Sequence, residues 1–268
     1  MKKALSSILF VIFLSIFLYS GYRLYLIFSE YHRGTSSYKE TASQYVSQSP
    51  LPPQKEGEQE TGEEEDPLTP PGLCPIQVDF GALRAENPDI KGWLYMEDSV
   101  ISYPVLQGAT NDTYLRHLPD GSYNTAGSLF IDSACRADLT DLTTIIYGHN
   151  MHNGSMFAVL ESYKKQSFYD SHPIMWYLTP EGTFRLDILA GFIESAEHPL
   201  YSLYETKEEL DGFLDYALPR SDFRTRCQET HPERIFILST CDYAYEDARY
   251  ILIAEPVPQE EQGISPGD

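Results

Sequence analysis

The sequence has few cysteines, few basic residues and only one long hydrophobic run. Four cysteines in 268 residues are too few for a disulfide scaffold. Nineteen Lys and Arg residues against 40 Asp and Glu residues give a formal net charge of -21, so nonspecific nucleic-acid binding is disfavoured by like charge. A single long apolar run excludes a polytopic membrane protein. The 42% hydrophobic and 13% aromatic content is enough for a core and excludes wholesale disorder.

The long hydrophobic run lies at the N-terminus. It follows Lys2 and Lys3 and is uncharged from Ala4 to Tyr22, which is long enough to span a bilayer core of about 30 Å as a helix. A cleaved signal peptide is the alternative, but its apolar region is usually only about 7–15 residues. We therefore expect residues 1–29 to contain a cytoplasmic start and a single-pass membrane anchor. The lysines before the span favour a cytoplasmic N-terminus, which places the rest of the chain outside the cell.

Residues 30–74 differ in composition from the segments on either side. Ser, Gln, Glu and Pro dominate, and few apolar residues are available for burial. We expect a disordered, acidic and extended stalk, with a partner-binding acidic tail as the alternative. Residues 256–268 have the same character and are expected to form a disordered tail. Residues 75–255 are then expected to form one domain.

Within this domain the apolar segments are short, rich in aromatic and β-branched residues and separated by turn residues, which is typical of strands. Eight of them suit a closed or nearly closed β-barrel: residues 92–96, 101–106, 127–132, 143–148, 174–179, 183–194, 234–240 and 249–255. Helical spacing predicts helices near 76–87, 156–163 and 203–218, the last at the barrel rim between two strands. On this rim helix, one face is expected to carry Leu203, Leu210, Phe213, Leu214 and Leu218.

A nucleophile and a cation are predicted at one end of the barrel. The strand at 234–240 runs into Cys241, and Arg249 opens the next strand. If these strands pair as a hairpin, the two residues face each other, and the cation favours the thiolate and can hold a developing oxyanion. The alternatives are a buried cysteine that packs as a small hydrophobic residue, and a surface arginine paired with Asp247 or Glu246.

His149 is the candidate partner of this thiol. It ends the strand at 143–148 as Cys241 ends its own strand. Two strand ends at one rim can bring together a thiol nucleophile and the base that it needs. A zinc site of His149, His152 and Cys241 is the alternative, but it lacks an evident fourth ligand and a Cys-x-x-Cys pair, so no metal is expected.

Longer sequence motifs surround these candidate residues. His149 lies in YGHNMHNGSMF, and ILSTCDYAYEDAR contains Cys241 and Arg249. Together with NPDIKGWLYM, YPVLQGATNDTYLRH and TAGSLFID, these segments resemble the class B sortases, membrane-anchored cysteine transpeptidases of Gram-positive bacteria. The family's Thr-Leu-x-Thr-Cys motif is present with Ile237 in place of its first threonine. The resemblance covers nearly all of residues 80–255 and implies an eight-stranded sortase-type β-barrel, with an N-terminal helix and a long helix inserted between the sixth and seventh strands.

The resemblance also implies a reaction. The Cys241 thiolate attacks the carbonyl of a threonine in the C-terminal sorting signal of a surface protein or pilin, His149 protonates the leaving amine, and Arg249 holds the oxyanion or the substrate backbone. An amine from a peptidoglycan precursor or a pilin lysine then attacks the thioester, and His149 takes its proton. No metal or organic cofactor is required. A hydrolytic thiol peptidase or L,D-transpeptidase, and a membrane-tethered binding module with an inert Cys241, are the alternatives.

Substrate contacts are likewise implied by the resemblance. Core packing is the alternative for two of them, Leu115 and Tyr147. A carboxylate directly after Cys241 raises the pKa of the thiol unless its side chain turns away. A disulfide among the three remaining cysteines is permitted outside the cell, but Cys241 must remain free; Cys74, Cys135 and Cys227 have no assigned role. The implied substrate-binding residues are Asn111, Leu115, Tyr147, Ser239 and Asp242.

Overall fold

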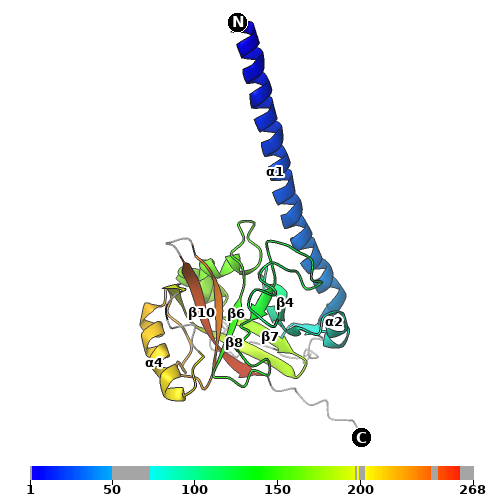
Figure 1. Cartoon of the computed structure of the whole chain (residues 1–268). Helices are drawn as coiled ribbons and strands as arrows, with labels where there is room; N and C mark the ends of the chain where they lie inside the picture. Colours follow the sequence, from blue (N-terminus) through cyan, green and yellow to red (C-terminus); the bar gives the residue numbers. More distant parts are fainter. Residues whose placement is uncertain (1, 50–72, 197, 199–202, 243–246, 260–268) are drawn as a thin grey trace, which may run out of the picture.

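A closed barrel of eight strands forms the centre of the chain (Figure 1). The computed structural model describes residues 2–49, 73–196, 198, 203–242 and 247–259. Around the barrel the strands follow the order β10-β8-β7-β3-β4-β5-β6-β9. All neighbours are antiparallel except β4 with β5 and β6 with β9, which are parallel. The strands are β3 (Ile90–Tyr95), β4 (Ser102–Leu106), β5 (Leu129–Ile131), β6 (Thr143–Tyr147), β7 (Ile174–Thr179), β8 (Gly182–Ser195), β9 (Ile235–Cys241) and β10 (Ala248–Pro258). Each coincides with one of the eight predicted segments, so the barrel is confirmed.

The predicted helices are present with shifted bounds. The first begins as a short strand, β2 (Ile76–Val78), and continues as α2 (Phe80–Glu86). The second is a 3₁₀ helix, η1 (Phe157–Lys164), followed by the unpredicted α3 (Gln166–Ser171).

The rim helix is α4 (Lys207–Ala217), continued by η3 (Leu218–Arg220), and it lies between β8 and β9, the sixth and seventh barrel strands in chain order. A capping box begins it, because the Thr206 hydroxyl accepts from the Glu209 backbone N–H while the Glu209 carboxylate accepts from the Thr206 N–H. Leu210, Phe213 and Leu214 are buried as expected. The predicted hydrophobic face was too long, because Leu203 precedes the helix and Leu218 lies in η3.

The N-terminal helix is much longer than the predicted anchor. It is α1 (Lys2–Tyr45), and its C-terminal part packs on the barrel before β1 (Val46–Gln48) pairs with β2. Tyr38 and Tyr45 are only 4% and 7% exposed, and the Tyr38 hydroxyl donates to the Gly127 carbonyl over 2.5 Å. The prediction of a disordered stalk is therefore wrong for residues 30–49, because buried tyrosines hold this segment on the domain.

The predicted end of the stalk at residue 74 and the predicted start of the tail at residue 256 were also misplaced. Cys74 is buried beside β2, and β10 extends to Pro258. The backbone N–H of Gln259 donates to the Thr183 carbonyl over 2.8 Å. The predicted C-terminal tail is therefore wrong for residues 256–259, and the remaining stalk and tail residues, 50–72 and 260–268, lie outside the described residues.

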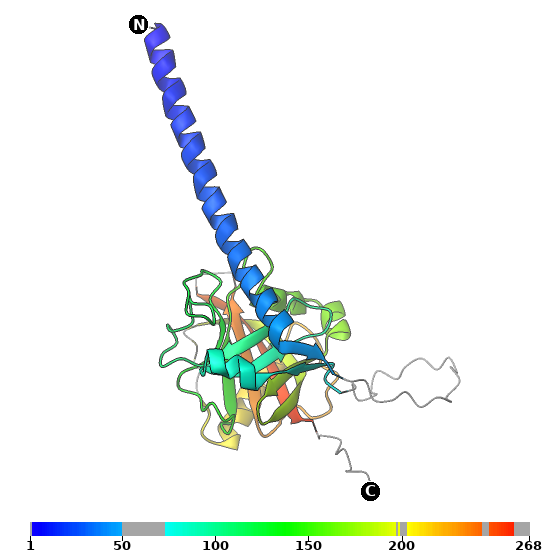
Figure 2. The same ribbon diagram turned by 90° about the vertical axis from the view of Figure 1, so that its right-hand side faces the viewer.

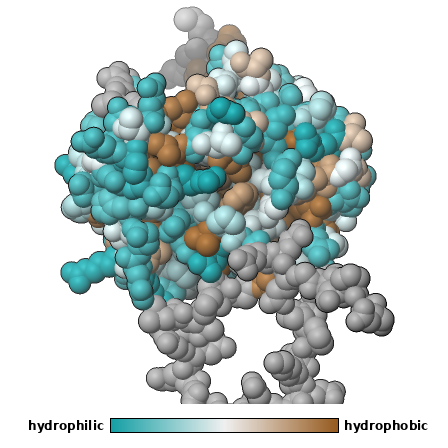
Figure 3. All heavy atoms as spheres, turned by 90° about the horizontal axis from the view of Figure 1, so that it is seen from below, coloured by the Kyte–Doolittle hydropathy of each residue, from teal (hydrophilic) through white to brown (hydrophobic). Residues whose placement is uncertain are grey.

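The N-terminal half of α1 projects away from the domain (Figures 1 and 2). Its large hydrophobic side chains from Ile8 to Phe28 are exposed. By length and composition, α1 is the one helix in the described part of the chain that is able to cross a membrane. The opposite end of the domain has a mostly hydrophilic surface with scattered hydrophobic residues (Figure 3).

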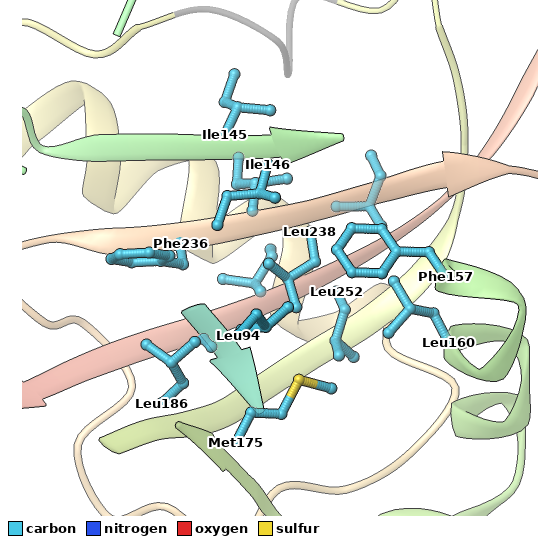
Figure 4. Close-up of a cluster of buried hydrophobic side chains, with 14 of the residues drawn as sticks. Leu94, Ile145, Ile146, Phe157, Leu160, Met175, Leu186, Phe236, Leu238 and Leu252 are labelled. Carbon is cyan, nitrogen blue, oxygen red and sulfur yellow. The ribbon is translucent and has the colours of Figure 1, made fainter. Parts of the chain in front are cut away.

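The barrel interior is filled by large aliphatic and aromatic side chains from strands all around the barrel, joined at one end by Phe157 and Leu160 of η1 (Figure 4). Burying one such side chain stabilises a fold by about 1.5–3 kcal/mol. The barrel therefore gives the strand ends a rigid support. The buried side chains of this core include those of Leu94, Met175, Leu186, Phe236, Leu238 and Leu252.

Candidate active site

Four neighbouring strands present the candidate residues on one face of the barrel wall. Phe130 on β5 lies opposite Tyr147 on β6, and Tyr147 lies level with Ser239 on β9. Two residues further along β9, Cys241 lies opposite Arg249 on β10. Residues opposite each other, and residues two apart on one strand, share a face of the sheet. The predicted pairing of Cys241 with Arg249 across the hairpin is therefore confirmed by the strand register.

His149 reaches the same place from β6. The backbone N–H of Gly148 donates to the Ser239 carbonyl over 3.1 Å, so the parallel β6 and β9 remain adjacent beyond the last strand pair. His149 and Cys241 each lie two residues beyond the level of Tyr147 and Ser239. The next residue, Asn150, donates from its side-chain amide to the Cys241 carbonyl over 3.0 Å. The two predicted strand ends thus meet at one rim.

These residues line a cleft of about 200 Å³. The four strands and the segment between β4 and β5 together supply its wall. Four of the five predicted substrate-binding residues, Asn111, Leu115, Tyr147 and Ser239, lie in this lining together with the three predicted catalytic residues. Asp112, Phe130, Gly148 and Thr240 complete it, and no role was predicted for these four from the sequence.

The ring of His149 is oriented by a backbone carbonyl. Its Nε2 lies 2.7 Å from the Leu115 carbonyl oxygen, and because a carbonyl only accepts hydrogen bonds, Nε2 carries the proton. In the neutral ring, Nδ1 is then the basic nitrogen. Burial lowers the pKa of His149, with a further decrease from the charge of Arg116 and an opposing effect of the Leu115 carbonyl. The site therefore favours a neutral imidazole with a defined tautomer.

Cys241 is one of two cysteines that are partly exposed, the other being Cys227, which lies outside the cleft lining. Cys241 is partly exposed in the cleft, whereas Cys74 and Cys135 are buried. Burial raises the pKa of both buried thiols to about 11, and it also raises the pKa of Cys227. All four cysteines are free thiols. Cys241 therefore lacks the full burial expected of a packing residue.

The alternative for Arg249 was a surface ion pair with Asp247 or Glu246. Arg249 forms no ion pair with Asp247, and Glu246 lies outside the described residues. Nη1 of Arg249 donates to the Ala248 carbonyl over 3.0 Å, which leaves other guanidinium N–H groups for an anion.

Asp242 lies outside the cleft lining, which corrects its predicted substrate contact. Its side chain is only 2% exposed, and its Oδ2 lies 2.5 Å from the Nζ of Lys164 at the end of η1. Lys164 also lies 3.9 Å from Glu161, whose carboxylate accepts from the Asn150 amide over 2.7 Å. Lys164 and Glu161 on η1 therefore hold the side chains of Asp242 and Asn150, and Asn150 in turn holds the Cys241 carbonyl. Apart from the position of Asn150 next to His149, no sequence pattern signals this role.

The zinc alternative finds no support in the described residues. No group of three or more His, Cys, Asp or Glu side chains among them is arranged to hold a metal ion.

Comparisons with known proteins give consistent matches over the domain. No family model matches the chain. Sortase B of Staphylococcus aureus (strain NCTC 8325 / PS 47) is 31% identical over 183 residues, covering 67% of this chain and 75% of that protein. The structure of a Staphylococcus aureus sortase B–substrate complex matches with a TM-score of 0.63 and 31% identity over 68% of this chain and 85% of that chain. The sortase B structure from B. anthracis in complex with AAEK1 matches with a TM-score of 0.69 and 27% identity over 87% of this chain and 100% of that chain.

Proposed function

Because the chain belongs to the sortase B family of cysteine transpeptidases, we propose that Cys241, His149 and Arg249 are its catalytic residues and that they cut a C-terminal sorting signal after threonine. The observation that carries this proposal is the placement of all three in one cleft, on adjacent strand ends. Barrel strands fix these ends, which supplies the preorganised geometry that a multi-step acyl transfer needs.

The first half of the reaction forms a thioester. The thiol proton of Cys241 passes to Nδ1 of His149, and the sulfur attacks the threonine carbonyl carbon. The carbonyl oxygen becomes an oxyanion, which the Arg249 guanidinium stabilises. When the peptide C–N bond breaks, the His149 imidazolium gives its proton to the leaving amine. Throughout, the Leu115 carbonyl keeps Nε2 protonated and the ring in place.

The second half transfers the acyl group to an amine. A primary amine enters the cleft, Nδ1 of His149 takes one of its protons, and the nitrogen attacks the thioester. The sulfur leaves as thiolate and the imidazolium returns the proton to it, which restores both groups. The acceptor is an amine of a peptidoglycan precursor or of a pilin lysine, and both fit this chemistry.

Substrate recognition is proposed for the part of the cleft away from Arg249. Asn111, Leu115, Tyr147 and Ser239 supply amide, apolar, phenolic and hydroxyl groups there. The matching Staphylococcus aureus sortase B forms a complex with a substrate, which supports the proposal that this chain also binds one. Asp242 is not included, because its side chain faces Lys164.

The apolar half of α1 is proposed to anchor the enzyme in the cell membrane with the N-terminus in the cytoplasm and the domain outside. Its length, its exposed hydrophobic side chains and the two lysines before it support this arrangement. Surface proteins and pilins that carry a sorting signal would then meet the cleft outside the cell. Protease digestion of intact cells tests the topology, since a cytoplasmic domain would be protected.

The decisive experiment uses the full chain in detergent with a panel of candidate sorting-signal peptides, with and without an added primary amine. Mass spectrometry is expected to find cleavage after threonine and an amine adduct when amine is present. Cys241→Ala should abolish both products, whereas the matched control Cys227→Ala should retain them. Turnover by Cys241→Ala would refute the proposal, and cleavage that never yields an adduct would identify a hydrolase instead.

A further inference from the structure

Asp132 connects two residues of the cleft wall. It directly follows β5, and its Oδ2 accepts one hydrogen bond from the Asn111 amide and one from the Tyr147 hydroxyl, each over 3.0 Å. Asn111 and Tyr147 both line the cleft, whereas Asp132 does not. The carboxylate therefore lies behind the wall and fixes two side chains that face the cleft.

An ordinary structural role explains only part of this arrangement. Asp132 Oδ1 accepts from the Ala134 backbone N–H over 2.8 Å, and its carbonyl accepts from the Cys135 N–H over 3.0 Å. This is a common turn after a strand, and it uses one carboxylate oxygen. The turn alone gives no reason for the second oxygen to bind groups from two other segments, 21 and 15 residues away in sequence.

These contacts determine what the wall offers to a peptide. The Asn111 amide cannot flip, because its nitrogen donates to a carboxylate while its Oδ1 accepts from the Ser133 N–H over 2.7 Å. One further N–H and one further lone pair of this amide remain for a ligand. Tyr147 gives its single hydroxyl proton to Asp132, so towards a ligand its oxygen is an acceptor.

We propose that Asp132 is a positioning residue for substrate recognition, which holds Asn111 and Tyr147 in the one arrangement that the sorting-signal peptide binds. The proposal rests on the proposed function of the cleft. Among the described residues, Asp132 forms no hydrogen bond or ion pair with Cys241, His149 or Arg249. Asp132 therefore acts on peptide binding rather than on the chemical steps.

Asp132→Asn is the most direct test, since an amide keeps the shape but has only one accepting oxygen. If that oxygen accepts from Asn111 and Tyr147, the new NH₂ group and the Ala134 N–H are two donors that face each other, and that hydrogen bond is lost. If the oxygen accepts from Ala134 instead, the NH₂ group faces the NH₂ group of Asn111, and the bond between the two side chains is lost. With the full chain, KM for a cleaved sorting-signal peptide is expected to rise about tenfold with kcat within about twofold, the pattern of lost uniform binding. Alkylation of Cys241 by iodoacetamide, which needs no peptide, should keep its rate.

A double-mutant cycle separates positioning from a merely structural role. In the Asn111→Ala/Tyr147→Phe background, Asp132→Asn should change KM by less than about twofold, because the groups it acts through are gone. The same tenfold increase in that background would overturn the proposal, as would an unchanged KM in the single variant or a loss confined to kcat. If Asp132→Asn fails to fold, Tyr147→Phe removes one of the two donors with the ring retained, and an unchanged KM in that variant would also overturn it.

The outcomes distinguish this proposal from the function of the cleft. If the unaltered chain cleaves no peptide of the panel, the proposed function fails. If it cleaves one and Asp132→Asn has the same KM, only the role of Asp132 fails.

Discussion

The buried ion pair behind Cys241 leads to an asymmetric prediction for two substitutions. Asp242 is 2% exposed at its side chain and Lys164 is 34% exposed, with 2.5 Å between Nζ and Oδ2. Lys164→Met leaves a buried carboxylate without its cation, which costs about 3–5 kcal/mol in comparable pairs. We expect about 3 kcal/mol, because water reaches the lysine side of the pair. Asp242→Asn should cost only about 1 kcal/mol, since the Lys164 ammonium can turn to solvent and an amide oxygen still accepts from it.

Thermal unfolding of the full chain in detergent measures both effects. Trp93 and Trp176, the two tryptophans of the sequence, are buried in the domain and report its unfolding by fluorescence. At about 2–4 °C per kcal/mol for a domain of this size, Lys164→Met should lower Tm by about 6–12 °C and Asp242→Asn by about 2–4 °C. The double variant should recover most of the loss. Equal costs for the two single variants, or a double variant as unstable as Lys164→Met, would refute the reasoning.

Three further predictions concern the cleft and its support. The pKa of His149 is lowered in the folded protein, so the unfolded chain binds more protons than the folded one below about pH 6.5, and stability should fall between pH 7 and pH 5. His149→Gln should reduce this fall, measured as the change in Tm over that range. An equal fall in the variant would contradict the role of His149. Gly127→Ala should cost more than about 1–3 kcal/mol and slow peptide cleavage, because Gly127 has φ 53° and a Cβ there would lie 2.3 Å from the Leu115 carbonyl oxygen that holds His149. Gly121→Ala, at φ 79° with nothing within 4 Å of its Cβ, is the matched control for backbone strain, and equal losses in Tm and cleavage rate would exclude the contact with Leu115. Tyr38→Phe should cost about 1–3 kcal/mol in thermal unfolding, because it leaves the buried Gly127 carbonyl without its donor, and an unchanged Tm would show that the bond contributes nothing.

The barrel and the meeting of its strand ends could be predicted because both depend on local sequence. Runs of β-branched and aromatic residues between turns mark each strand, and Cys241 and His149 were identified by their position at strand ends. The hairpin of β9 and β10 then requires Arg249 to face Cys241. These inferences need only the alternation of side chains and the pairing of neighbouring strands.

The remaining features depend on contacts between distant segments. The direction of Asp242 is set by Lys164, 78 residues earlier, and no local pattern gives that information. Composition was misleading for residues 30–49, because an average dominated by polar residues concealed Tyr31, Tyr38 and Tyr45, which recur every seven residues and pack on the barrel. That spacing places them on one helix face and was the available signal.

The continuity of α1 limits how the enzyme can move at a membrane. The helix contains no proline, and it runs from its apolar half directly into contacts at Glu30, whose carboxylate accepts from the Thr125 N–H. With the apolar segment in a bilayer as proposed, the eight residues from Arg23 to Glu30 rise only about 12 Å at 1.5 Å per residue. The helix then holds the catalytic domain at a short, fixed distance from the membrane, as a flexible linker would not. Substrate and acceptor therefore have to bring their reacting groups to the height of the cleft above the bilayer.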